Sequence, residues 1–291
     1  MNAIETTHLT KFYGSARGIE NLDLKVEQGD FFGFIGPNGA GKSTTIRLLL
    51  GLITPTSGGA RVLGLDIRRE KTEILRHVGY LPSEITFYPG MKVSQVLELS
   101  AGLRGARCRE EAELLCQRLQ LDTGRRVEDL SLGNRKKVGI VCALQHRPEL
   151  LILDEATSGL DPLMQREFFE ILRERNRQGT TVFLSSHVLS EIQRNCTRAA
   201  IIRQGKIITA GAVSNLAQSS ARRVQLQGSL DLSGLPGIRD LTSQSGSMSF
   251  LYSGPMPQLL ERLSQAKVQE LTIAEPDLEE IFLHYYEEES K

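Results

Sequence analysis

The sequence lacks a long apolar run. No stretch approaches the roughly 18 consecutive apolar residues that predict a membrane-spanning helix. The opening residues, MNAIETTH, contain neither the charged nor the apolar region of a secretory signal. These two absences predict a protein that stays in the cytoplasm.

The sequence also lacks an excess of charge of either sign. Its 35 lysines and arginines balance 35 aspartates and glutamates, which gives a formal net charge of +0. A protein that holds a nucleic acid through its phosphates usually carries an excess of positive charge. The balance therefore argues against a nucleic-acid partner.

No pair of cysteines has CxxC spacing. The four cysteines lie in or beside apolar stretches, where a thiol usually packs as a small hydrophobic group; they are Cys108, Cys116, Cys142 and Cys196. Metal binding and redox chemistry need partner residues that the sequence does not supply. The sequence predicts reduced, buried thiols.

Composition and length indicate an ordinary folded protein. Hydrophobic residues make up 40% of the chain and charged residues 24%, which excludes a disordered, collagen-like or coiled-coil chain. A chain of 291 residues is long enough for about two domains and buries about three quarters of its unfolded surface.

Short apolar runs alternate with helix-period segments between Phe31 and about Ser186. This alternation is typical of a mostly parallel sheet with helices on both faces. The predicted strands are 31–35, 78–81, 150–153 and 181–184. Residues 93–145 have an almost entirely helical pattern and predict a helical insert. The segments before Gly29 and after Arg198 alternate with period two, so we expect antiparallel hairpins there.

The composition turns small and polar around residues 214–220, which predicts a domain boundary. We expect a first domain at 1–214, with a helical subdomain at about 84–146, and a small α+β domain at 221–291. The order of elements in the second domain is close to a split β-α-β arrangement. Its last helix predicts packing within the chain or, alternatively, a partner surface, because one face carries Leu278, Ile281, Phe282 and Tyr285.

Residues 36–43 read GPNGAGKS, which matches the phosphate-binding pattern G-x-x-x-x-G-K-[ST] between a predicted strand and a helical run at 44–50. Glycines let successive backbone N–H groups turn toward an anion, and the helix N-terminus adds its positive end. We expect Lys42 to contact the β- and γ-phosphates and Ser43 to hold Mg²⁺. A chance glycine-rich turn is the alternative, and the motif alone leaves kinases, GTPases and motor ATPases open.

Residues 150–155 read LLILDE, an apolar strand that ends in two carboxylates. We expect Asp154 to hold Mg²⁺, directly or through water, and Glu155 to polarise an attacking water. His187 follows the next predicted strand, where its imidazole can hydrogen-bond a γ-phosphate oxygen. A solvated strand end and a structural histidine are the alternative interpretations.

Residues 130–134 read LSLGN and precede the basic helix start Arg135-Lys136-Lys137. A donor-rich loop at a helix N-terminus predicts a second anion site. The two loops need not meet within one chain, and an anion flanked by both suggests two chains that face each other.

These motifs, in this order, resemble the ATP-binding cassette of ABC transporters over about residues 4–211. The resemblance implies an α/β fold of the P-loop NTPase type with an antiparallel subdomain and a helical insert. It identifies GPNGAGKS as the Walker A loop, LLILDE as the Walker B strand, LSLGN as the signature and residues 158–161 as the D-loop. The implied catalytic residues are Glu155, His187 and Lys42. The implied nucleotide contacts are Tyr13, which stacks on adenine, and Gly36, Pro37, Asn38, Gly39, Ala40, Gly41, Lys42, Ser43, Thr44, Ser131, Gly133, Asn134 and Asp161.

The resemblance also implies partners. Two cassettes, expected to be two copies of this chain, enclose two ATP molecules with Mg²⁺, each Walker A loop facing the other chain's signature. The ATPase would drive a separate integral membrane permease from the inner face of the cell membrane. The C-terminal domain looks like the accessory domain on cassettes of drug, antibiotic and bacteriocin exporters.

Two other functions share part of this motif set. A soluble ABC ATPase that acts on ribosomes or DNA is the alternative, although the single cassette, the lack of a heptad tract and the zero net charge argue against it. A P-loop kinase would need an acceptor site and a lid in place of LSLGN.

The sequence departs from the family pattern at two places. Leu132 and Asn134 replace a glycine and the glutamine of the usual LSGGQ signature, while Ser131 and Gly133 keep the hydroxyl and backbone donors. Ser83 stands where the family has its Q-loop glutamine, so we expect Glu84 or a bridging water to substitute.

The segment after Ser83 carries three large apolar side chains, Phe87, Tyr88 and Met91. Aromatic anchors are typical of interface pockets, so we expect a permease helix to dock in a groove bounded by this segment. Packing of these side chains under the helices of the insert is the alternative.

Overall fold

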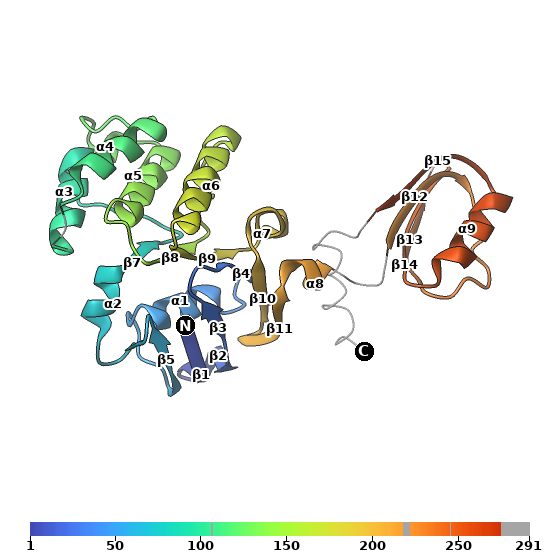
Figure 1. The fold of residues 1–291 in the computed structure, drawn as a ribbon, viewed down its shortest axis with the longest axis horizontal. Coiled ribbons are helices and arrows are strands. Elements are labelled where there is room, and N and C mark those ends of the chain that lie inside the picture. Colours follow the sequence, from blue (N-terminus) through green and yellow to red (C-terminus); the bar gives the residue numbers. More distant parts are fainter. Residues whose placement is uncertain (106, 218–221, 245, 275–291) are drawn as a thin grey trace. The chain divides into compact units, whose positions relative to one another are not determined.

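The computed structural model describes residues 1–105, 107–217, 222–244 and 246–274. The chain divides into two compact units, Met1–Ala210 and Gly211–Lys291 (Figure 1). Each unit buries a hydrophobic core of its own. Among the residues described, no helix combines the length and the apolarity needed to cross a bilayer.

A six-stranded sheet forms the centre of the first unit, in the order β11-β10-β4-β9-β8-β7. The pairs β10–β4, β4–β9, β9–β8 and β8–β7 are parallel. The strands are β4 (Phe31–Ile35), β7 (Val78–Leu81), β8 (Leu150–Asp154), β9 (Thr181–Ser186), β10 (Arg198–Arg203) and β11 (Lys206–Ala212). All residues of β4, β8 and β9 are buried, because parallel strands covered on both faces are apolar throughout. The four strands predicted between Phe31 and Ser186 are confirmed.

β10 corrects the expectation for the region after Arg198. The strand lies in the central sheet, parallel to β4, with Arg198 opposite Phe32. Its residues 199–202 are all buried, as expected for a strand that is covered on both faces inside a mostly parallel sheet. The hairpin predicted at Gln204-Gly205 is present, because this two-residue connection joins β10 to its neighbour β11, and such a short connection makes the two strands antiparallel.

A second sheet of the first unit is antiparallel, which confirms the hairpins predicted before Gly29. Its order is β2-β1-β5-β6, with β3 also paired to β1. The strands are β1 (Asn2–Tyr13), β2 (Ala16–Leu22), β3 (Lys25–Glu27), β5 (Ser57–Val62) and β6 (Leu65–Asp66). Helix α1 (Lys42–Leu49) shares one core with both sheets, which includes Ile4, Phe32, Ile46 and Ile152.

The helical insert predicted at 93–145 contains α3 (Val93–Leu103), α4 (Arg109–Arg118), a 3-10 turn (Val127–Asp129) and α5 (Leu132–Leu144). Figure 1 shows these green helices grouped together beside β7 and β8. Helix α5 packs against β7. The other helices of this unit are α2 (Lys71–His77), α6 (Pro162–Arg177) and α7 (Leu189–Asn195).

Ion pairs connect the insert to the rest of the first unit. Arg118 of α4 donates to Glu167 Oε1 (2.6 Å) and to both carboxylate oxygens of Glu174 (2.5 and 3.0 Å), which lie on α6. The buried carboxylate of Glu111, also on α4, pairs with Arg175 of α6. These contacts hold α4 against α6.

All four cysteines are free thiols, and Cys108, Cys116 and Cys196 are buried while Cys142 is partly exposed. Burial raises the pKa of each thiol, to about 11 for Cys116 and for Cys142. A thiol with a raised pKa stays protonated and is a poor nucleophile. The predicted burial is confirmed for three of the four.

The second unit contains α8 (Val213–Ala217), β12 (Arg222–Ser229), β13 (Ile238–Gln244), β14 (Ser247–Tyr252), α9 (Met256–Gln265) and β15 (Lys267–Ala274). The sheet order is β13-β14-β12-β15, and every pair in it is antiparallel. Because β12 separates β14 from β15, the β14-α9-β15 segment is a split β-α-β unit, as predicted. The helix predicted around Leu278 and Tyr285 lies outside the described residues.

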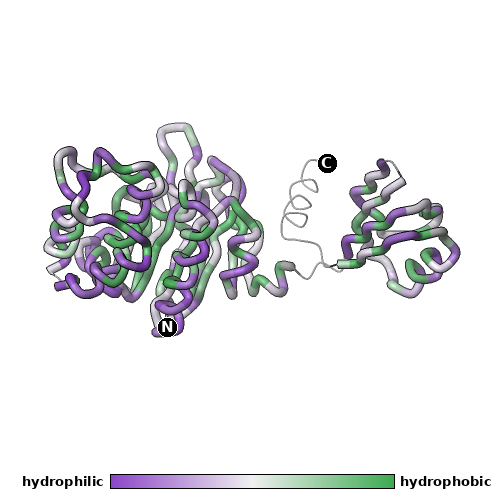
Figure 2. The backbone as a smooth tube through the Cα atoms, turned by 90° about the horizontal axis from the view of Figure 1, so that it is seen from above, coloured by the Kyte–Doolittle hydropathy of each residue, from purple (hydrophilic) through white to green (hydrophobic). Residues whose placement is uncertain are grey.

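Hydropathy follows these layers. Figure 2 shows hydrophobic segments running through the interior of the first unit and hydrophilic segments on its outer helices and loops. In the second unit, Val224, Phe250, Tyr252 and Leu259 are at most 1% exposed, so α9 covers one face of the sheet. Burial of such side chains contributes about 1.5–3 kcal/mol each relative to exposure.

Candidate functional site

The loop at residues 36–43 connects β4 to α1. Gly39 (φ +79°) and Gly41 (φ +110°) have left-handed backbone conformations, which favour glycine. A Cβ atom on Gly41 would lie 2.7 Å from Ile19 Cγ2 and 2.9 Å from the carbonyl oxygen of Gly18. Gly41 caps α1 without a side-chain hydrogen bond. The first backbone N–H groups of α1 can therefore bind an anion.

Lys42, the first residue of α1, is only 6% exposed. Its Nζ donates to the carbonyl oxygens of Gly36 (2.6 Å) and Pro37 (3.2 Å). The same atom lies 3.4 Å from Glu155 Oε1. A buried ammonium needs such oxygen partners because it has left water. The charge expected to contact phosphates is therefore held within the loop.

Asp154 is the last residue of β8 and is buried. Its Oδ2 accepts a hydrogen bond from Ser43 Oγ (2.8 Å), and its Oδ1 accepts one from Ser185 Oγ of β9 (3.1 Å). Parallel pairing of β8 with β9 places Asp154 opposite Ser185. The two residues expected to hold Mg²⁺, Ser43 and Asp154, are thus in contact, and their oxygens are of the type that Mg²⁺ prefers.

Glu155 follows Asp154 and has a left-handed backbone, with φ of +50°. Its N–H donates to the carbonyl oxygen of Ser185 (3.0 Å). Its Oε2 lies 2.6 Å from His187 Nδ1, and within the described chain Oε1 is buried with no hydrogen-bond partner, 3.4 Å from Lys42 Nζ. A buried carboxylate oxygen without a hydrogen bond is available to a ligand's proton donor. The structure therefore brings together Lys42, Glu155 and His187, which the sequence had placed on three separate segments.

A cavity of about 410 Å³ opens beside these groups. Its lining includes most of the expected nucleotide contacts, namely Tyr13, Pro37, Asn38, Gly39, Gly41, Lys42, Ser43 and Thr44, together with Ser83 and Glu155. Gly36 contributes its carbonyl to Lys42, and Ala40 is buried in the core. Tyr13 is 46% exposed, and the ammonium of Lys11 lies over its ring, 5.3 Å from the ring centroid.

Two lining residues, Arg17 and Gly18, were not predicted from the sequence. They lie at the start of β2, directly after the hairpin that carries Tyr13. Arg17 donates to Gln204 Oε1 (3.3 Å) and pairs with Glu20 (3.7 Å). No motif includes Arg17 or Gly18. The only signal in the sequence was their position close to Tyr13, the expected adenine contact.

The residues of LSLGN and the D-loop lie elsewhere. Ser131, Gly133, Asn134 and Asp161 are not among the described residues that line this cavity. Ser131 caps α5 by accepting a hydrogen bond from the N–H of Asn134 (3.3 Å). Asp161 caps α6 through the N–H groups of Leu163 and Met164.

These two segments contact each other. A Cβ atom on Gly133 would lie 2.7 Å from the carbonyl oxygen of Gly159, and one on Gly159 would lie 3.2 Å from the side chain of Leu132. Leu132 itself is 63% exposed. One chain therefore presents the phosphate-binding loop and the LSLGN segment as separate sites.

Ser83 lines both the 410 Å³ cavity and a neighbouring groove of about 600 Å³. The groove lies between the segment after β7 and α5, and its lining includes Glu84, Ile85, Phe87, Leu132 and Lys136. Phe87 and Met91 are partly buried, and Tyr88 is 71% exposed. Of these three side chains, Tyr88 is exposed, whereas Phe87 lines the groove.

Lys136 corrects the interpretation of the basic helix start. The side chain is 3% exposed, and its Nζ donates to the carbonyl oxygens of Pro82 and Ser83 (both 3.1 Å). Its charge thus faces the protein interior and not an anion at the surface. Burial lowers the pKa of Lys136 to about 8, against the opposing attraction of Asp154 and Glu155.

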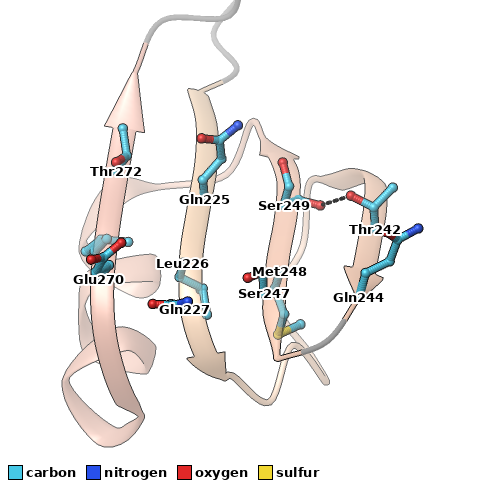
Figure 3. A pocket seen from close by; sticks show the side chains of 11 residues that line it. Gln225, Leu226, Gln227, Thr242, Gln244, Ser247, Met248, Ser249, Glu270 and Thr272 are labelled. Carbon is cyan, nitrogen blue, oxygen red and sulfur yellow. Dashed lines mark hydrogen bonds between the residues drawn. The ribbon is translucent and has the colours of Figure 1, made fainter.

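A further hollow, of about 520 Å³, lies on the sheet of the second unit (Figure 3). Its lining is mostly uncharged and polar, with Gln225, Gln227, Ser249 and Thr272 on the open face and Glu270 as its one titratable side chain among the described residues. Thr242 Oγ1 donates to the carbonyl oxygen of Ser249 (3.3 Å). Among the described residues, its lining includes none of the motif residues and no pair of groups suited to acid–base chemistry.

Comparison with known proteins shows which family the chain belongs to. A family model described as ABC transporter matches residues 19–158. The chain is 40% identical over 230 residues to the bacitracin transport ATP-binding protein BcrA of Bacillus licheniformis, over 77% of this chain and 74% of that protein. This chain belongs to the ATP-binding subunits of ABC transporters. It binds ATP and hydrolyses it.

Two other similarities extend the comparison. The uncharacterized ABC transporter ATP-binding protein YhaQ of Bacillus subtilis is 31% identical over 294 residues, over 95% of this chain and 96% of that protein. A solved structure of the ATP-binding subunit of an ABC transporter superposes with a TM-score of 0.71 at 28% identity, covering 74% of this chain and 92% of that one. The predicted ABC cassette fold is confirmed.

Proposed function

We propose that Glu155 is the general base of ATP hydrolysis in this cassette. The observation that carries the proposal is the position of its carboxylate, between Lys42 Nζ (3.4 Å) and His187 Nδ1 (2.6 Å) beside the phosphate-binding loop. A carboxylate there can accept a proton from a water that attacks the γ-phosphate. The imidazole of His187 orients that carboxylate and contacts the γ-phosphate.

The loop residues bind the rest of the nucleotide. The backbone N–H groups of 39–44 bind phosphate oxygens, Lys42 contacts the β- and γ-phosphates, and Tyr13 stacks on adenine. Ser43 and Asp154 hold Mg²⁺, and the fit is supported by their mutual hydrogen bond of 2.8 Å. Bound Mg²⁺ supplies positive charge that offsets the charge on the phosphates.

The same proposal makes the working form a pair of cassettes, expected to be two copies of this chain. This part of the proposal is supported by four residues that are expected to contact the nucleotide but do not line the 410 Å³ cavity of their own chain, namely Ser131, Gly133, Asn134 and Asp161. In the pair, the Ser131 segment of one chain would complete the phosphate contacts of the other. Each ATP is then bound by two chains.

We further propose that the cassette powers an exporter whose permease is a separate chain. The similarity to a bacitracin transport ATP-binding protein supports a role in the transport of antibiotics. A permease helix would dock in the groove of about 600 Å³ beside Ser83 and Phe87, which places the cassette on the inner face of the cell membrane. Residues 1–214 would form the cassette, with the helical subdomain at 84–146, and 221–291 an accessory domain.

The substitution Glu155→Gln tests the catalytic proposal. The amide keeps the shape of the side chain but cannot accept the proton, so turnover should fall at least about a hundredfold while ATP binding persists. The trapped state should be an ATP-dependent dimer. Phosphate release measures turnover, and size-exclusion chromatography with ATP and Mg²⁺ measures dimer formation.

Glu149→Gln is the matched control. It makes the same exchange at the other end of β8, beside His77 and away from the cavity. Its turnover should equal that of the unmodified chain. Hydrolysis by Glu155→Gln at the control rate would exclude Glu155 as the general base.

A further inference from the structure

Glu191 lies on α7, next to the two strand ends that carry Glu155 and His187. Its Oε1 accepts a hydrogen bond from Thr157 Oγ1 (2.6 Å), and its Oε2 accepts one from Ser186 Oγ (2.9 Å). Thr157 is 7% exposed and Ser186 is 2% exposed. The two donor hydroxyls therefore belong to buried residues, and a charge-assisted hydrogen bond is strong where water is partly excluded.

The two hydroxyls belong to the two catalytic segments. Thr157 is in the turn after β8, two residues after Glu155, and Ser186 is the last residue of β9, directly before His187. One carboxylate thus joins the segment of the proposed base to the segment of the histidine that contacts it. Glu191 itself is not among the described residues that line the 410 Å³ cavity.

The bonds have a fixed direction. An ionised carboxylate has only acceptor oxygens, so both hydroxyls must donate to it. The Ser186 oxygen in turn accepts the N–H of Val188 (2.9 Å), which fixes the backbone on the other side of His187. Glu191 is held on α7 by its N–H bond to the carbonyl oxygen of Val188 (3.2 Å).

We propose that Glu191 is a positioning residue for ATP hydrolysis, which holds the carboxylate of Glu155 and the imidazole of His187 in contact by binding Thr157 and Ser186. The inference rests on the proposed roles of Glu155 and His187. Both side chains lie on turns that follow strand ends, and such turns are freer to shift than the strands themselves. A displacement of about 1 Å at a reacting group can reduce turnover by about a hundredfold.

Steady-state ATPase kinetics of Glu191→Ala test the proposal. Because Glu191 does not line the nucleotide cavity, kcat should fall about tenfold to a hundredfold while KM for ATP changes less than about twofold. Glu191→Gln should restore most of kcat, since the amide oxygen still accepts one hydroxyl and the amide N–H group can donate to the other. Gln193→Ala, an exposed position on the same helix, is the matched control and should leave both constants unchanged.

A second variant covers the case in which Glu191→Ala does not fold. Thr157→Val with Ser186→Ala removes both hydroxyls and leaves Glu191 in place, and it should reproduce the loss of kcat. Adding Glu191→Gln to this pair should cause no further loss. A kcat within about twofold of the control in either Glu191→Ala or the double variant would overturn the proposal.

The outcome is separable from the test of the proposed function. If Glu155→Gln abolishes turnover while Glu191→Ala does not, only the role of Glu191 fails. If Glu155→Gln retains turnover, the proposed base fails whatever Glu191 does. A rise in KM of Glu191→Ala with unchanged kcat would assign Glu191 to nucleotide binding and would also overturn the proposal.

Discussion

Glu155 combines a left-handed backbone with a buried carboxylate oxygen that has no hydrogen-bond partner among the described residues. Its φ of +50° lies in the left-handed region, which costs a residue with a Cβ about 1–2 kcal/mol. Such strain persists where the surroundings hold it, and here the N–H of Glu155 is bound by the carbonyl oxygen of Ser185 (3.0 Å). The turn aims the carboxylate toward Lys42 and His187 instead of continuing β8.

Burial changes the acid–base behaviour of Lys136. Burial lowers its pKa to about 8 from the ordinary value of 10.5. Between these two values the unfolded chain binds more protons than the folded chain, so the contribution of Lys136 to stability increases as the pH rises. Below the folded pKa the buried ammonium costs stability in full.

Urea unfolding of the unmodified chain and of Lys136→Met measures this contribution. The free energy of unfolding of the unmodified chain, minus that of the variant, should increase from about pH 7 to about pH 10. Subtracting the variant removes the titration of groups common to both chains. A difference that falls with pH would show that the folded pKa is not lowered.

At the scale of elements, the ends of β8 and β9 carry the proposed catalytic residues. Parallel pairing places Asp154 beside Ser185, and the residues after each strand then turn toward α1 and α7. In open parallel sheets, ligands bind at the carboxyl ends of the strands because the connecting loops gather there. The site therefore depends on strand pairing between segments about 30 residues apart in sequence.

The attachment of α4 to α6 gives a prediction about stability. Arg118→Ala removes three hydrogen bonds to Glu167 and Glu174 from a side chain that is 25% exposed, so unfolding should become easier by about 1 kcal/mol. Arg109→Ala is the control, because its ion pair with Glu113 lies on the exposed face of α4. Thermal unfolding compares the two, and equal midpoints would contradict the prediction.

The groove beside α5 gives a prediction about docking. Phe87→Ser should leave the basal ATPase of the isolated chain nearly unchanged, since Phe87 does not line the nucleotide cavity, but should weaken co-purification with the permease. Tyr88→Ser is the control, because Tyr88 is adjacent and exposed but outside the groove lining. Loss of basal ATPase in Phe87→Ser would instead assign its side chain to the core.

At the scale of the whole molecule, two separate sites on one chain predict complementation. Lys42→Ala and Ser131→Ala should each be inactive, because each homodimer has two damaged sites. An equal mixture should recover about a quarter of the unmodified activity, since half of the dimers are mixed and each has one intact site. With subunit exchange confirmed, a mixture no more active than either variant would contradict a site shared by two chains.

Much of the architecture could be predicted from local patterns. β4, β8 and β9 are short, wholly apolar runs between turns, so their existence and parallel arrangement follow from the sequence. The pairing of β10 could not be predicted, because its burial depends on a strand that lies more than 160 residues earlier in the chain. Arg17 could not be predicted as a lining residue of the cavity for the same reason, since only folding brings β2 to the phosphate-binding loop.

The sequence by itself predicted the chemistry, because glycines at fixed spacing and one lysine suit phosphate, and of the two adjacent carboxylates the first suits Mg²⁺ and the second an attacking water. It also determined the family, through the order of those motifs. Only the tertiary structure decided which side chains meet: Glu155 with His187, Lys136 with the carbonyl groups before Glu84, and Glu191 with two hydroxyls. These contacts join segments that are distant in sequence, and their geometry follows from strand pairing and helix packing, which no local pattern encodes.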